Sequence, residues 1–159
     1  MCGGRCVFGN KVVKSTMQCC VWKGEVMKVH EMRTRVRYAD TDQMGVVHHA
    51  RYLEYFEMGR TEWMRQLGLP YSEVERRGVF LAVVEAYLRY KKEVRFDAEI
   101  VIRTWVERVG GAKVKFCYEV CDSDGVAAEG WTVLGSVDKE GRPMRMPSWL
   151  RNALEDAIR

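Results

Sequence analysis

The residues best suited to chemistry lie together in a short stretch, residues 42–49, which precedes the longest predicted helix. Asp42 supplies a carboxylate, Gly45 would let the backbone turn closely against a ligand, and His48 and His49 stand where the helix should begin. A helix N-terminus presents unpaired N–H groups and the positive end of the helix dipole, so a carbonyl placed there would be polarised. A nearby carboxylate could attack that carbonyl or activate a water. The stretch is therefore a candidate site for chemistry at a carbonyl group.

The same residues also have structural interpretations. An aspartate before a helix is commonly a cap, and Asp40 or Asp42 could simply satisfy backbone amides; spacing alone favours this role. Adjacent histidines point to different sides of a helix, so His48 and His49 should not both line one site, although one could orient a substrate or move a proton near neutral pH. No third or fourth ligand is spaced nearby, so these histidines are not expected to bind a metal.

Other charged residues are weaker candidates. Glu54 and Glu57 belong to a charged face of the predicted helix, where solvent-exposed ion pairs are expected. Glu85 interrupts an apolar strand and should face solvent or an interface. Arg108 and Lys113 flank a Gly-Gly turn and could hold phosphate groups, although ordinary solvated turn charges explain them equally well.

The elements that must position these residues begin with a strand and a long helix. The strand is predicted from His30 to Tyr38, and the helix from about His48 to Leu67, because apolar residues recur there at helical spacing. The buried stripe of the helix comprises Tyr52, Tyr55, Phe56, Gly59, Trp63 and Leu67. Charged residues cover its other faces, namely Arg51, Glu54, Glu57, Arg60, Glu62 and Arg65.

Four strands joined by tight turns follow the helix. They are predicted at 80–92, 99–108, 113–121 and 126–138, and short helices are predicted at about 71–77 and 148–158. One face of the first of these strands should carry Phe80, Ala82, Val84, Ala86, Leu88 and Tyr90. In the third, Val114, Phe116, Tyr118 and Val120 should point inward and Cys117 outward.

This order of elements predicts an α+β domain with a five-stranded antiparallel sheet. The long helix is apolar along one stripe, so it must be buried, and the concave face of the sheet is the available partner. Open sheet edges favour association, so a dimer is expected.

Composition and charge narrow the class of protein. The chain has 159 residues and a net charge of +4, of which +3 lies in residues 1–27. Those residues show no sustained period and are predicted to be a flexible extension, or an upstream translation start, ahead of one domain at 28–159. The nearly neutral domain gives no electrostatic basis for binding nucleic acid, and its apolar runs are too short to cross a membrane. Six cysteines without paired metal-site spacing, and no secretory segment, favour a reducing cytoplasm.

The stretch from Arg35 to Tyr52 carries a family resemblance. It reads RVRYADTDQMGVVHHARY and resembles the signature of the 4-hydroxybenzoyl-CoA thioesterase family, closest to its branch of Tol–Pal-associated acyl-CoA thioesterases. The similar order of elements extends over residues 30 to about 150. The resemblance implies a hotdog fold, in which the sheet wraps a long helix, and homodimers or homotetramers with active sites at the dimer interface.

The resemblance also implies roles for single residues. Asp42 matches the catalytic carboxylate, and His49 matches the residue whose backbone N–H polarises the thioester carbonyl, with a further side-chain role in some members. Tyr38 matches an aromatic residue beside the site. The candidates for contact with substrate are Tyr38, Gly45, Val46, Val47, Arg108 and Lys113.

The implied activity is hydrolysis of an acyl-CoA thioester to a free carboxylic acid and CoA, without metal or bound cofactor. Asp42 could act as nucleophile through a mixed anhydride or as general base on water, and the sequence does not choose between them. Three alternatives stay open: a hotdog hydratase or dehydratase of acyl thioesters, a non-catalytic acyl-CoA-binding module, and an interaction protein in cell-envelope or lipid-synthesis complexes, for which acyl carrier protein is the partner to test. Aromatic, short-chain and long-chain acyl groups are all compatible with the pattern.

Overall fold

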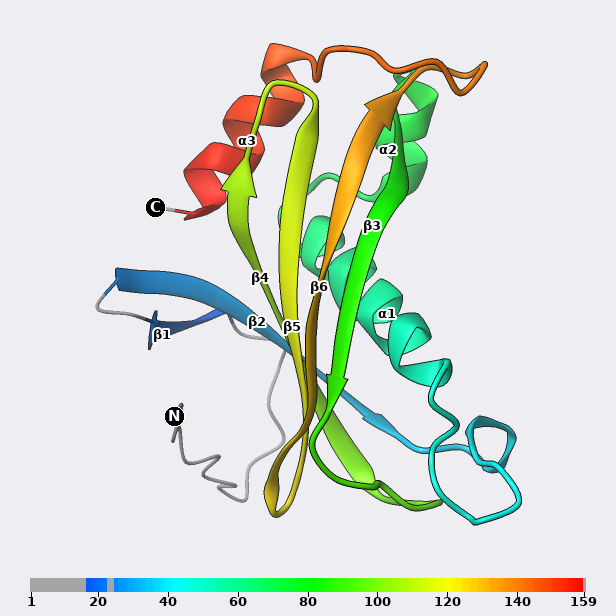
Figure 1. Cartoon of the computed structure of the whole chain (residues 1–159). Helices are drawn as coiled ribbons and strands as arrows, with labels where there is room; N and C mark the ends of the chain where they lie inside the picture. The colour runs from blue at the N-terminus through cyan, green and yellow to red at the C-terminus, as the bar shows by residue number, and fades with distance from the viewer. Residues whose placement is uncertain (1–16, 23–24, 159) are drawn as a thin grey trace.

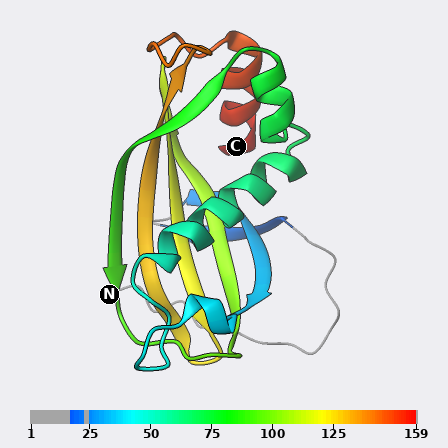
Figure 2. The ribbon, with the colours of Figure 1, turned by 90° about the vertical axis from the view of Figure 1, so that its right-hand side faces the viewer.

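The computed structural model describes residues 17–22 and 25–158, with side chains from residue 28 onward. Its elements are β1 (Met17–Trp22), β2 (Glu25–Arg35), the 3-10 helix η1 (Tyr38–Asp40), α1 (Arg51–Gln66), α2 (Tyr71–Arg76), β3 (Phe80–Tyr90), β4 (Glu99–Val109), β5 (Lys113–Asp122), β6 (Gly125–Val137) and α3 (Ser148–Ile158). The strands form a six-stranded antiparallel sheet in the order β1-β2-β4-β5-β6-β3. This sheet curves around α1, which crosses its concave face (Figures 1 and 2).

All five predicted strands are present, and β1 adds a sixth at the edge beside β2. The sequence placed residues 17–22 and 25–27 outside the domain, whereas the structure places them in β1 and the start of β2. The flexibility predicted for residues 1–16 lies outside the described residues. Among the described residues, no helix is both long and apolar enough to span a membrane.

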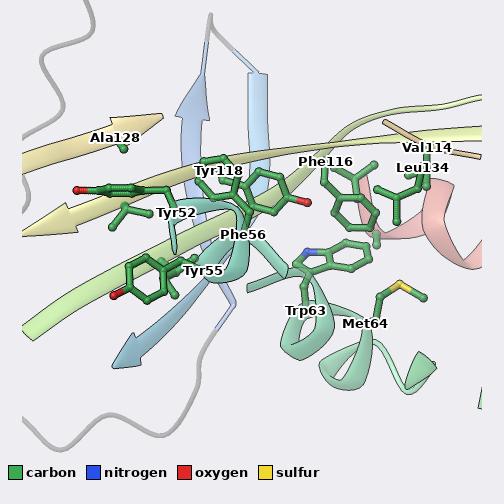
Figure 3. Packing of buried hydrophobic residues seen from close by; sticks show 14 of the residues in the cluster. Tyr52, Tyr55, Phe56, Trp63, Met64, Val114, Phe116, Tyr118, Ala128 and Leu134 are labelled. Atoms are coloured by element: carbon green, nitrogen blue, oxygen red, sulfur yellow. The ribbon is translucent and has the colours of Figure 1, made fainter. Parts of the chain in front are cut away.

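The core lies between α1 and the concave face of the sheet. Phe56 of α1 stacks on Tyr118 of β5 with ring centroids 4.4 Å apart, and Trp63 meets Phe116 edge-on at 5.4 Å (Figure 3). Gly59 lets the helix approach β4 closely, because an added Cβ would lie 2.4 Å from the hydroxyl oxygen of Thr104. The predicted buried stripe of this helix is confirmed for Tyr52, Tyr55, Phe56, Gly59 and Trp63, and Leu67 packs against the core as a partly buried residue just past the helix.

Strand β5 follows its predicted alternation. The four inward residues, Val114, Phe116, Tyr118 and Val120, are at most 1% exposed. Cys117 is also buried, although it points outward, because it lies between Trp105 and Trp131 in the neighbouring strands.

Strand β3 departs from the prediction that six alternating residues share one face, and that prediction is wrong. The register of β3 against β6 shifts between Val83 and Glu85, which is the mark of a β-bulge. Leu81 and Leu88 consequently both pack against the core, although a regular strand would turn residues seven apart to opposite faces. Nothing in the run of valines and alanines distinguishes a bulged strand from a regular one.

Two boundaries around the candidate loop also differ from prediction. Strand β2 ends at Arg35 instead of continuing to Tyr38, which begins η1. Helix α1 begins at Arg51, because residues 48–50 form a turn before it. Both differences leave residues 36–50 as one connected loop ahead of the helix.

Candidate active site

The base of this loop is fixed by Asp40, which is only 1% exposed. Its carboxylate accepts hydrogen bonds from the backbone N–H of Arg37 at 2.9 Å and from the Nη2 of the same residue at 2.7 Å. The hydroxyl of Tyr55, from α1, donates to its Oδ2 at 3.2 Å. The side-chain hydrogen bonds from Arg37 are the main reason that the pKa of Asp40 is lowered. Asp40 is therefore a structural carboxylate that ties the loop to α1.

Backbone hydrogen bonds close the loop above this base. The carbonyl of Asp40 accepts the N–H of His48 at 2.8 Å, and Thr41 pairs with Val47 as an antiparallel bridge. Val47 donates in turn to the carbonyl of Val94 at 2.8 Å. Residues 41–47 thus form a tight, hairpin-like loop.

Asp42 lies in this loop and is only partly engaged. Its Oδ1 accepts the N–H of Met44 at 2.8 Å, and its carbonyl accepts the N–H of Gly45 at 2.9 Å. Gly45 has a φ of +73°, the left-handed conformation that the turn requires. In the described part of the chain, no group hydrogen-bonds to Oδ2 of Asp42. One oxygen therefore holds the turn while the other remains available.

The capping interpretation holds in a narrower form than expected. Asp42 does satisfy an amide, that of Met44, but it does not cap α1. The N-cap of α1 is Ala50, which makes no side-chain capping hydrogen bond.

The turn of residues 48–50 brings both histidines to the start of α1. Their ring centroids are 4.1 Å apart, so the prediction that His48 and His49 face different sides is wrong; it assumed that both lay within the helix. The Nδ1 of His48 accepts the N–H of Ala50 at 3.3 Å, and the carbonyl of His49 accepts the hydroxyl hydrogen of Tyr90 at 3.0 Å. Among residues 17–22 and 25–158, no acceptor contacts the N–H of His49.

A surface cleft of about 450 Å³ opens beside this turn. It is lined by Ala39, Thr41, His48, Ala50, Arg51 and Glu54. Asp42 and His49 are not among these lining residues, although each is next in sequence to one of them. Within a single chain, the cleft therefore reaches the rim of the candidate site and not its two central groups.

The remaining loop residues support or border the site. Val46 and Val47 are buried, and Val46 bridges to Arg95. Tyr38 is 80% exposed and packs edge-on against Phe96 at 5.7 Å. Buried valines fix the loop, whereas the exposed aromatic pair borders it.

Arg108 and Lys113 do not join Asp42 within one chain. They flank the β4–β5 hairpin, at the opposite end of the sheet from the loop that precedes α1 (Figure 1). The ammonium of Lys113 lies 3.6 Å from the carboxylate of Glu85, whose side chain is exposed as predicted.

The charged face of α1 is largely as expected. Glu54 pairs with Arg51 at 2.5 Å, and Glu57 lies 3.6 Å from Arg60. Arg60 itself is only 8% exposed, so its assignment to a solvent-covered face is wrong. Burial, and then the hydroxyls of Tyr118 and Tyr71 from other elements, act on the pKa of Arg60, an influence that helical periodicity does not reveal.

The sequence did not indicate Arg37, Tyr55 or Tyr90 as parts of this region. Tyr55 was predicted only as a core residue, and Tyr90 is 41 positions from the carbonyl that it contacts. Among the described residues, no cluster of three or more histidine, cysteine or acidic side chains could hold a metal ion.

Comparison with known proteins gives a consistent set of matches. The family model described as the thioesterase-like superfamily matches residues 36–154. A Bacillus subtilis protein named "Putative acyl-CoA thioesterase YneP" is 40% identical over 99 residues, which cover 62% of this chain and 72% of that protein. The crystal structure of the hypothetical protein TT1821 from Thermus thermophilus superposes with a TM-score of 0.77 at 38% identity, covering 80% of this chain and 98% of that one. A DHNA-CoA thioesterase from Staphylococcus aureus gives a TM-score of 0.75 at 28% identity, with coverage of 80% and 89%.

Proposed function

Since this chain belongs to the thioesterase-like superfamily, we propose that it hydrolyses acyl-CoA thioesters to a free carboxylic acid and CoA, with Asp42 as the reacting carboxylate. The hotdog fold expected from the sequence is confirmed by the two solved structures. The name of the Bacillus subtilis relative supports an acyl-CoA substrate.

One observation carries the assignment of residues. In the segment that leads into α1, Oδ2 of Asp42 and the N–H of His49 each lack a hydrogen-bond partner among the described residues, whereas both carboxylate oxygens of Asp40 accept hydrogen bonds. An unpaired acceptor and an unpaired donor near one helix N-terminus are what attack on a thioester requires.

The chemistry follows from these two groups. The carbonyl oxygen of the thioester accepts the N–H of His49, which stabilises the negative charge that develops on it. Asp42 then either attacks the carbonyl carbon and expels CoA as thiolate, leaving a mixed anhydride for water to cleave, or takes a proton from the attacking water. Both routes use the same two groups.

We also propose that the site is completed in a dimer formed along β3. This strand is an edge of the sheet, and its large apolar side chains are exposed: Val83, Val84, Tyr87 and Tyr90 are 46–49% accessible. Antiparallel pairing of β3 with a second copy would cover them. It would also bring the β4–β5 hairpin end of one copy toward the 42–49 loop of the other, so that Arg108 and Lys113 could bind CoA phosphates across the interface.

We further propose a cytoplasmic location, which the cysteines support. Cys117 is a buried free thiol, as a reducing compartment allows. We also propose a tetramer built from two such dimers, with acyl carrier protein as a further partner.

The decisive experiment is release of free thiol from a series of aromatic, short-chain and long-chain acyl-CoAs by the full chain and by Asp42→Asn. The wild-type protein should turn over at least one substrate, and the variant should lose about 10²–10⁴-fold in kcat, the usual contribution of a reacting acid or base. Asparagine can still accept the N–H of Met44, so the variant should fold normally.

Three outcomes would contradict the proposal. A folded Asp42→Asn protein that keeps wild-type turnover on every substrate would remove Asp42 from the reaction. Conversion of an enoyl-CoA without CoA release would indicate a hydratase. Tight acyl-CoA binding without turnover would indicate a binding module.

A further inference from the structure

The peptide unit between His49 and Ala50 is held at both of its ends. Its carbonyl accepts the hydroxyl of Tyr90 at 3.0 Å, and its N–H donates to Nδ1 of His48 at 3.3 Å. The carbonyl before it, that of His48, accepts the N–H of Arg51 at 2.9 Å. The turn that carries the unpaired N–H of His49 is therefore pinned by groups on either side.

Outside help is needed here because α1 does not cap itself. Ala50 has no side chain that could accept the amides of the first helical turn. The first turn is tightened by the N–H of Leu53, which donates to the carbonyl of Ala50 at 3.2 Å. The carbonyl of His49 instead receives the Tyr90 hydroxyl, which comes from the end of β3.

The ring of Tyr90 has a separate anchor. It packs edge-on against Tyr52 in the first turn of α1, with centroids 5.4 Å apart. Burial raises the pKa of Tyr90, so its hydroxyl keeps the hydrogen that it donates. Removing the hydroxyl alone should leave this ring contact in place.

We propose that Tyr90 is a positioning residue for the reaction: its hydroxyl fixes residue 49 so that the N–H of His49 points at the thioester oxygen. This inference rests on the proposed function, because it gives that N–H a task. Donors that stabilise an oxyanion act through fixed geometry, so a turn that loosens would lower the rate of the chemical step more than it weakens substrate binding.

The test is Tyr90→Phe in the full chain, with Tyr87→Phe as the matched control. Tyr87 lies on the same strand with similar exposure, 46% against 49%, but its ring stacks on Trp131 and its hydroxyl makes no hydrogen bond to a described residue. Tyr87→Phe removes a hydroxyl from the same proposed dimer face and measures what that face alone contributes. Relative to it, Tyr90→Phe should lower kcat about a further 10-fold with KM changed less than about 2-fold. In a ¹⁵N–¹H spectrum, the His49 amide should shift or broaden in the Tyr90→Phe variant only.

The outcomes separate this inference from the proposed function. A wild-type protein that releases no CoA from any acyl-CoA contradicts the function. A wild-type protein that does so, with a Tyr90→Phe variant of unchanged kcat and unshifted His49 amide, contradicts only the role of Tyr90. A loss confined to KM would also overturn that role, because it would place Tyr90 in ground-state binding. The spectrum decides the matter even if the variant is too unstable for kinetics, since it reports on the turn directly.

Discussion

The base and the tip of the 40–48 loop carry the same residue type and use it in opposite ways. At the base, Asp40 is buried and its carboxylate accepts hydrogen bonds from Arg37 and Tyr55. At the tip, Asp42 accepts one turn amide with Oδ1, while no described residue hydrogen-bonds to its Oδ2. Asp40 is thus a structural carboxylate, whereas Asp42, two positions later, is a candidate reacting one.

The contrast shows how the fold holds an exposed carboxylate in a fixed position. Loops are normally the most mobile part of a fold, yet a reacting group needs a fixed place. Here the fixed place comes from the base, where Asp40 links η1 to α1 and its carbonyl holds the N–H of His48. The tip can then leave an oxygen unpaired without losing its geometry.

The largest difference in stability is expected between Asp40→Asn and Asp42→Asn. An asparagine at 40 turns an N–H₂ group toward donors, so the hydrogen bonds from Arg37 or Tyr55 are lost inside the protein. The free energy of unfolding should fall by about 2–3 kcal/mol, the usual value for hydrogen bonds to a buried charged group. Asp42→Asn should stay within about 0.5 kcal/mol of wild type. Urea denaturation at neutral pH measures both.

Equal losses in the two variants would contradict the comparison between base and tip. A stable Asp40→Asn protein with normal turnover would do so as well, because it would mean that the loop does not depend on its base.

The pH dependence of stability should separate the two positions further. Hydrogen bonds from Arg37 lower the pKa of Asp40, so its ionised form stabilises the fold. That contribution is fully present above the unfolded pKa of about 3.9 and is lost as the pH falls through the lower folded pKa. The gap in unfolding free energy between wild type and Asp40→Asn should therefore be constant near neutral pH and should narrow below about pH 4. Denaturant titrations between neutral and acidic pH measure it; a gap that stays constant on acidification would show that the charge is not its source.

The spacing of apolar residues predicted burial correctly where a residue's position within its own helix or strand decides which way its side chain points. The stripe from Tyr52 to Trp63 and the alternation from Val114 to Val120 both came out as predicted. The bulge at Val84 did not, because valine and alanine suit either face of a strand. The exposure of Arg60 was mispredicted for a related reason: its burial arises from the folded chain and not from the spacing within its own helix.

In the candidate site, too, the contacts between different elements were not predicted from the sequence. Spacing favoured a capping role for Asp40 or Asp42, and only the family resemblance favoured Asp42 as the reacting carboxylate. Asp40 differs from Asp42 because its carboxylate accepts hydrogen bonds from the hydroxyl of Tyr55, 15 positions away, and from the side chain of Arg37. The contact between Tyr90 and His49 spans 41 positions and depends on how β3 meets the start of α1. Such contacts exist only in the folded chain, so no local pattern could reveal them.

The smallest expected effect concerns the tip itself. Gly45 has a φ of +73°, and an added Cβ would meet no atom within 4 Å, so Gly45→Ala introduces backbone strain without a clash. The cost should be about 1–2 kcal/mol, and Gly45→Asn should cost less because asparagine tolerates this conformation. Thermal unfolding of both variants measures the cost, and thiol release measures its effect on Asp42, whose carbonyl accepts the N–H of residue 45 at 2.9 Å. If the tip only presents Asp42, turnover should fall more in the alanine variant than in the asparagine variant while both remain folded. If Gly45→Ala lost as much stability as Asp40→Asn, the tip would be part of the same rigid base. The two aspartates would then differ only in their hydrogen bonds.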